Sequence, residues 1–191
     1  MNNSDDGFTF YRRNLPHYQI PGAEYFITFR LIGSLPQALL KEFKETNDGE
    51  LPDSMIERKK QEFIQGILDK GGYGPTWLKR PEIASIIMDS LFYRDGDIYE
   101  LYGFCIMPNH VHLIFRHIGQ EKNGGNTVPE ILHSLKLYTA RKANKILGRT
   151  GQFWQHESYD HIIRDNDELH DILVYTLYNP VEAGLVERWE D

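Results

Sequence analysis

The chain has 191 residues, a length typical of one domain with its own hydrophobic core. The single cysteine excludes a disulfide-stabilised scaffold and fits a reducing cytoplasm, and the net charge of -7 argues against a uniformly basic nucleic-acid-binding surface. No apolar run reaches the length of a membrane span and no secretory segment opens the chain, so we expect a cytoplasmic protein without membrane contact.

The first part of the chain is expected to contain an arm, one strand and several helices. Residues 1–20 form the arm, in which Arg12 and Arg13 supply positive charge. Residues 24–32 are rich in aromatic and β-branched side chains, which predicts a strand. Residues 37–95 are predicted to be mainly helical, in two or three segments separated by glycine-containing breaks.

The second part is predicted to contain a β-hairpin, a helix, a short strand and a last helix. Their ranges are 99–107 and 110–117 for the hairpin strands, 128–147, 158–164 and 166–178. Pro180 is expected to end the last helix, because the residue before a proline avoids the α region. We therefore expect an α+β protein with a ferredoxin-like βαββαβ antiparallel sheet, an enlarged helical first crossover and an appended C-terminal helix, all within a single domain spanning residues 1–191.

His110-Val111-His112, at the start of the second hairpin strand, is the most informative motif. Side chains two positions apart on a strand point to the same face, so the two imidazoles project together while Val111 and Leu113 face a core. Two convergent imidazoles supply half of a divalent-metal site, although two surface histidines would give the same pattern. A metal site needs a third ligand from elsewhere in the chain.

A tyrosine on the predicted last helix lies outside the apolar stripe of that helix. The stripe follows helical spacing and comprises Leu169, Ile172, Leu173, Thr176 and Leu177. Tyr175 falls away from its centre, and Asn179 lies one turn further on, on nearly the same face. This phenol and amide, held off the core face, are candidates for chemistry.

Positive charge is concentrated between residues 132 and 164, despite the negative total. Candidate contacts with a polynucleotide are Lys136, Tyr138, Arg141, Lys142 and Lys145, together with the arm residues Arg12 and Arg13. A solvated helix face would give the same pattern. Trp154 and its neighbour Phe153 could stack on an unpaired base or cap the core.

Six segments, in this order, resemble the single-tyrosine HUH transposases, and specifically the branch associated with repetitive extragenic palindromes (REP) in bacteria. They are RRNLPH (12–17), GAEYFITF (22–29), MPNHVH (107–112), LKLYTAR (135–141), GQFWQHESYD (151–160) and YTLYNPVEAGL (175–185). Each segment alone is a weak signal, but their order and spacing together are specific.

The resemblance implies that His110 and His112 ligate a divalent cation, Mg²⁺ or Mn²⁺, and that Tyr175 is a nucleophile. Related transposases carry a glutamine as third metal ligand four residues after the tyrosine, a position that Asn179 occupies here. The implied reaction is cleavage and rejoining of single-stranded DNA at palindromic hairpins through a 5′-phosphotyrosine intermediate, without ATP.

Alternatives remain open at this point. A hairpin-binding protein without catalysis would not need the candidate catalytic residues, and a metal hydrolase would need an Asp or Glu ligand, for which no spacing stands out. No base for Tyr175 is evident, although His156 and His161 are candidates by their position in the chain. We expect a monomer, with a dimer that exchanges the tyrosine helix as the alternative.

Overall fold

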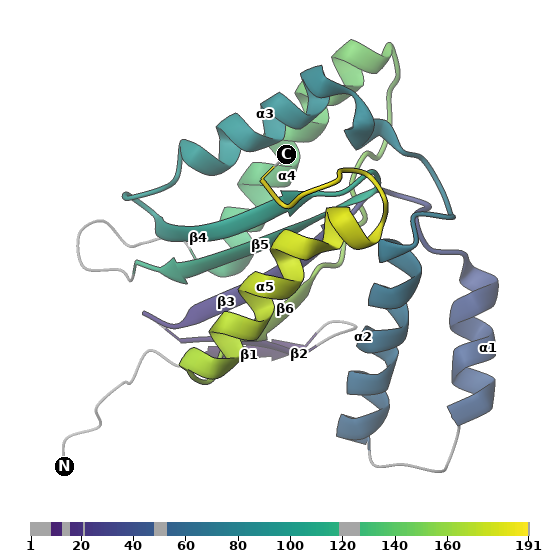
Figure 1. The fold of residues 1–191 in the computed structure, drawn as a ribbon, viewed down its shortest axis with the longest axis vertical. Coiled ribbons are helices and arrows are strands. Elements are labelled where there is room, and N and C mark those ends of the chain that lie inside the picture. The colour runs from purple at the N-terminus through teal and green to yellow at the C-terminus, as the bar shows by residue number, and fades with distance from the viewer. Residues whose placement is uncertain (1–8, 13–15, 21, 48–52, 119–126, 191) are drawn as a thin grey trace.

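The fold is built on a four-stranded antiparallel sheet in a computed structural model that describes residues 9–12, 16–20, 22–47, 53–118 and 127–190. The strands are β3 (Glu24–Arg30), β4 (Tyr99–Ile106), β5 (His110–His117) and β6 (Tyr159–Ile162), in the spatial order β4-β5-β3-β6. The central strands are therefore β5 and β3, as Figure 1 shows. The expected α+β class and antiparallel sheet are confirmed.

The described residues form five α-helices in addition to the strands. They are α1 (Gln37–Asn47), α2 (Asp53–Asp69), α3 (Pro81–Phe92), α4 (Val128–Leu147) and α5 (Asn166–Glu182), with a short 3₁₀ turn, η1 (Trp77–Lys79), before α3. Helices α3 and α4 cover one face of the sheet and α5 lies on the other, while α1 and α2 extend from one end of it (Figure 1). The connection between β3 and β4 is thus helical, as predicted.

Helix α5 continues past Pro180 to Glu182, so the prediction that Pro180 ends this helix was wrong. A proline inside a helix lacks the N–H that would bond four residues back, which here is a single backbone bond near the helix end. The last turn is closed by the Ala183 amide, which donates to the Asn179 carbonyl over 3.0 Å. As a result Asn179 lies inside α5, and the helix fixes the direction in which its side chain leaves the backbone.

The N-terminal region contains more structure than an arm. Strands β1 (Thr9–Arg12) and β2 (Pro16–Gln19) pair as a separate two-stranded antiparallel sheet, which was not predicted. Arg13 and the side chain of Arg12 lie outside the described residues, so their predicted contacts with DNA stay predictions.

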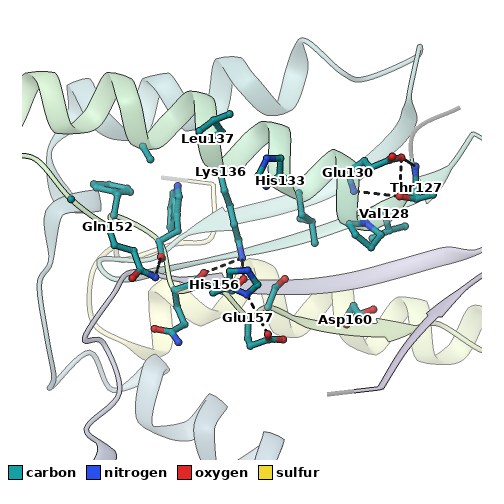
Figure 2. Close-up of a pocket in the computed structure, with 18 residues that line it drawn as sticks. Thr127, Val128, Glu130, His133, Lys136, Leu137, Gln152, His156, Glu157 and Asp160 are labelled. Carbon is teal, nitrogen blue, oxygen red and sulfur yellow. Dashed lines mark hydrogen bonds and ion pairs between the residues drawn. The ribbon is translucent and has the colours of Figure 1, made fainter. Parts of the chain in front are cut away.

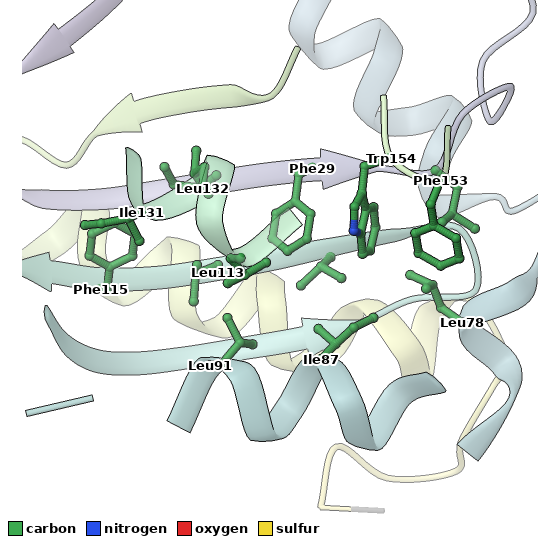
Figure 3. Packing of buried hydrophobic residues seen from close by; sticks show 14 of the residues in the cluster. Phe29, Leu78, Ile87, Leu91, Leu113, Phe115, Ile131, Leu132, Phe153 and Trp154 are labelled. Atoms are coloured by element: carbon green, nitrogen blue, oxygen red, sulfur yellow. The ribbon is translucent and has the colours of Figure 1, made fainter. Parts of the chain in front are cut away.

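The main core lies between the sheet and the α3–α4 layer (Figure 3). It includes Trp154, which is 4% exposed, packs edge-on against Phe29 and donates its indole N–H to Thr139 Oγ1 over 2.9 Å. Of the two roles considered for Trp154, the structure therefore shows core packing, and a buried indole is not accessible for stacking on a base. Phe153, at 1% exposure, is buried beside it.

Candidate functional site

The two histidines of the motif meet on the face of the sheet opposite the main core. His110 and His112 are both fully buried on β5, and their Nε2 atoms lie 3.0 Å apart. Val111 and Leu113 point into the main core. The prediction that the two imidazoles project together is confirmed.

A carboxylate from α2 completes the cluster. Asp69, the last residue of α2, places Oδ1 at 3.3 Å from His110 Nε2 and 3.6 Å from His112 Nε2. These three residues form the one group of metal-ligand type found among the described residues. The sequence reading found no acidic ligand, so Asp69 is a correction to it.

The outer nitrogen of each imidazole has its own hydrogen-bond partner. His110 Nδ1 lies 2.8 Å from Asn109 Oδ1, an atom that can only accept, so Nδ1 carries the proton. His112 Nδ1 lies 2.9 Å from Thr28 Oγ1, whose hydroxyl donates to Gln65 Oε1. Partners of this kind are typical of metal-bound histidines, because they fix the tautomer and aim the other nitrogen inward.

The inner atoms of the cluster are therefore three acceptors that face one another. The Gln65 amide nitrogen donates toward His112 Nε2 and Asp69 Oδ1, each over 3.1 Å, but no proton lies between the three acceptors themselves. Ligand atoms about 2.1 Å from a tetrahedral cation lie roughly 3.4 Å apart. The separations of 3.0, 3.3 and 3.6 Å fit that geometry, so the donor set is suited to a divalent cation.

Burial and charge set the protonation of the cluster. Burial lowers the pKa of His110 to about 4 and also lowers the pKa of His112, so both imidazoles are neutral at pH 7. Burial alone would raise the pKa of Asp69, but the polar contacts of its carboxylate, among them the hydrogen bond that Tyr175 donates, outweigh it and lower that pKa. Neutral imidazoles and an ionised carboxylate are the forms that bind metals.

Tyr175 belongs to the same cluster. Its hydroxyl donates to Asp69 Oδ2 over 2.7 Å, and its ring packs edge-on against His112 with centroids 5.5 Å apart. Asp69 thus directs one oxygen to the histidines and the other to the phenol. Burial, and then the negative charge of Asp69, raise the pKa of Tyr175, which keeps the phenol protonated in this arrangement.

Asn179 lies next to the cluster, one turn after Tyr175. Its Nδ2 is 3.5 Å from His112 Nε2, the side chain is 3% exposed, and its Oδ1 has no hydrogen-bond partner in the described structure. The oxygen and nitrogen of an amide are assigned from hydrogen bonds, and rotation by 180° would aim the unpartnered oxygen at the cluster. Asn179 can therefore supply one further oxygen as a metal ligand.

The two other histidines considered as bases have different partners. His156 lies 3.3 Å from Glu157, and His161 lies 3.0 Å from Glu168. The hydrogen-bond acceptor of the phenol is Asp69, which the sequence reading did not single out.

The candidate DNA contacts on α4 divide into two groups. Tyr138, Arg141, Lys142 and Lys145 are exposed. Lys136 instead donates to the backbone carbonyls of Gln155 and His156 over 3.2 and 3.1 Å, and burial lowers its pKa to about 8. It lines a cavity of about 940 Å³ between α4 and the segment 151–160, as Figure 2 shows.

The comparison of sequences agrees with the motifs. No family model matches the chain. Over 101 residues, 49% of this chain, the sequence is 30% identical to a Haemophilus influenzae protein named "Putative REP-associated tyrosine transposase", and the match spans 56% of that protein. A solved REP-associated tyrosine transposase bound to a REP hairpin aligns over 95% of this chain and 78% of that chain, with a TM-score of 0.49 and 18% identity.

No helix in the described parts of the chain is long and apolar enough to cross a membrane. The sequence comparison confirms, over about half of the chain, its resemblance to a REP-associated tyrosine transposase.

Proposed function

We propose that this protein cleaves and rejoins single-stranded DNA beside palindromic hairpins, with Tyr175 as nucleophile and a divalent cation in the His110–His112–Asp69 cluster. One observation carries the proposal: the phenol is hydrogen-bonded to the same carboxylate that faces both imidazoles. A tyrosine placed for packing alone would not need this contact. The similarity to a REP-associated tyrosine transposase supplies the class of substrate.

The residues that would hold the cation are Asp69, His110 and His112, with the amide oxygen of Asn179 as a further ligand. Two imidazole nitrogens beside carboxylate and amide oxygens suit Mn²⁺ better than Mg²⁺, which prefers oxygen ligands alone. When bound, the cation offsets the negative charges of Asp69 and of the scissile phosphate.

The remaining chemistry belongs to side chains of the chain itself. Asp69 Oδ2 orients the phenol, and the packing of the Tyr175 ring against His112 limits its rotation. The phenolic oxygen forms a bond to phosphorus while the bond from phosphorus to the 3′-oxygen breaks, leaving a 5′-phosphotyrosine and a 3′-hydroxyl. The phenol gives its proton to Asp69, its hydrogen-bond acceptor, and the departing 3′-oxygen takes up one proton from water.

We propose that the hairpin is bound through the exposed side chains of α4, Tyr138, Arg141, Lys142 and Lys145, with Arg12 and Arg13 of the N-terminal region adding charge. Few phosphate contacts and a net charge of -7 imply modest affinity that weakens as salt rises. The strand order supports a ferredoxin-like assignment within one domain spanning residues 1–191, and we expect a monomer.

A metal-dependent hydrolase is the second candidate, because Asp69 supplies the carboxylate ligand that such an enzyme requires. In that case water, and not Tyr175, would attack the substrate.

A single assay separates the candidates. The protein is incubated with Mn²⁺ and a labelled hairpin oligonucleotide that carries single-stranded extensions, and the products are separated on a denaturing gel. We expect a covalent adduct with the native chain and with Tyr178→Phe, an exposed tyrosine on the same helix that serves as the matched control. Tyr175→Phe should bind the hairpin but give no adduct. Turnover without an adduct would favour the hydrolase. Binding without cleavage would favour a hairpin-binding protein that has no catalytic activity.

A further inference from the structure

Arg30 places a positive charge beside the metal-ligand cluster, and it has no part in the proposed reaction. Arg30, the last residue of β3, pairs directly with His110 in the sheet register, as Thr28 pairs with His112. Residues that pair directly across two strands point to the same face, with Cβ atoms about 5 Å apart. The guanidinium of Arg30 therefore starts from the face that carries the cluster.

Arg30 is half-buried. Its Nη1 donates to Ser34 Oγ over 3.2 Å, and none of the described carboxylates forms an ion pair with it. Removing a charge from water is costly unless the charge is paired. Among the described residues, most donors of this half-buried guanidinium have no acceptor, so it is suited to an anion that arrives from solution.

Arg30 also lines a cavity of about 270 Å³ between β3, α1, α2 and the segment 155–159. Thr28 and Gln65, which contact His112, line the same cavity, so it adjoins the cluster. The acidic residue on its wall, Glu157, is close to His156 and interacts with the charge of Lys136. Arg30 and Lys60 give the cavity two cationic side chains.

The cavity continues toward the basic side of the protein. Gln155, Glu157 and Ser158 line both this cavity and the larger one beside α4, so the two cavities adjoin along one segment of chain. A strand that passes from α4 around this segment would reach Arg30 before it reaches the cluster.

We propose that Arg30 binds the backbone phosphate next to the scissile phosphate and so sets the position at which the strand is cut. The inference rests on the proposed function, because it assigns a place to the same DNA strand. Arginine suits this role, since its planar guanidinium can donate two parallel hydrogen bonds to one phosphate.

The test measures binding in the full-length Tyr175→Phe chain, so that the DNA stays uncut. The probe is the hairpin oligonucleotide in which each phosphate near the cut site is replaced in turn by an uncharged methylphosphonate. In the Tyr175→Phe chain that keeps Arg30, one such replacement should weaken binding about tenfold. Arg30→Gln should weaken binding of the unmodified probe by the same factor and make it insensitive to that one replacement. Arg58→Gln, which removes an exposed arginine of α2, is the control and should keep the sensitivity.

The proposal would be overturned if Arg30→Gln did not weaken hairpin binding. It would also be overturned if Arg30→Gln weakened the binding of every methylphosphonate probe by the same factor. Arg30→Lys should recover part of the affinity, because it restores the charge but not the paired donors. The readout is independent of cleavage: failure of the native chain to form an adduct would overturn the proposed function and leave the phosphate contact measurable.

Discussion

Asp69→Asn tests the third candidate metal ligand of the cluster with almost no change in the shape of the side chain. The structure predicts opposite effects on the metal-free and metal-bound protein. In the metal-free protein, the new amide can donate to an imidazole lone pair while its oxygen keeps the hydrogen bond from Tyr175. Without metal, Asp69→Asn should therefore melt at the same temperature as the native chain or higher.

Metal binding should fall sharply in the same variant. Loss of a partner that only orients a ligand costs about 10–100-fold in metal affinity, so loss of the one charged ligand should cost at least about 100-fold. At a Mn²⁺ concentration 100 times the native dissociation constant, binding stabilises the native chain by about 2.7 kcal/mol, and the variant by about 0.4 kcal/mol. For a chain of this size, the melting temperature should rise by about 5–11 °C in the native protein and by about 1–2 °C in the variant.

The assay is thermal unfolding with and without Mn²⁺, with dissociation constants from calorimetry. Asp97→Asn, which removes an exposed carboxylate remote in sequence from the cluster, is the control and should keep the full shift. If Asp69→Asn kept the native Mn²⁺ shift, Asp69 would not be a ligand and the geometric argument for the site would fail.

Two further predictions concern the cluster and one concerns the main core. Below pH 6.5 the unfolded chain protonates imidazoles that the fold keeps neutral through the lowered pKa values of His110 and His112. Between pH 6.5 and about 4, His110 alone should therefore cost the metal-free protein at most about 1.4 kcal/mol of unfolding free energy per pH unit as pH falls. His112 adds to this loss, so His110→Asn should reduce the slope in denaturant titrations. Thr28→Val should weaken Mn²⁺ binding about 10–100-fold in calorimetry, because it removes the acceptor for His112 Nδ1, and unchanged affinity would refute that orienting role. Trp154→Ala should lower the unfolding free energy by about 3–5 kcal/mol without changing the hairpin affinity of the folded protein, whereas a loss of affinity at native stability would contradict its place in the core.

Local sequence rules predicted the parts of the site that a single element determines. The period of two on β5 was enough to place His110 and His112 on one face, because that alternation is strict in a strand. Helical spacing likewise placed Tyr175 and Asn179 on one side of α5. Helical spacing could not show that the side of α5 with Tyr175 and Asn179 faces the cluster, because that depends on how α5 packs across the sheet.

Asp69 was missed because its role is a property of tertiary structure. It ends a helix in the long connection after β3 and meets Tyr175 across 106 residues of sequence. No spacing relates it to the histidines. The one available signal was that a pair of metal-ligating imidazoles needs an acidic partner, and that requirement does not indicate which acidic residue provides it.

Residue type was a poor guide to exposure in the segment after α4. Trp154 stands among polar neighbours in sequence, but its backbone forms a bridge with Leu31, which draws the indole into the core. Lys136 was predicted to contact DNA from its charge, whereas its ammonium group binds two carbonyls of this same segment. Both outcomes depend on the path of the chain between α4 and β6.

We propose that one cluster holds both the cation and the attacking phenol. The most direct test of this proposal uses the hairpin oligonucleotide labelled at its 3′ end, with Mn²⁺ or with a chelator, followed by tryptic digestion and mass spectrometry of the adduct. We expect a labelled adduct that requires Mn²⁺, a free 5′ fragment ending in a 3′-hydroxyl, and a nucleotide on the peptide that contains Tyr175. An adduct on another residue, or the same yield in the presence of the chelator, would contradict the proposal.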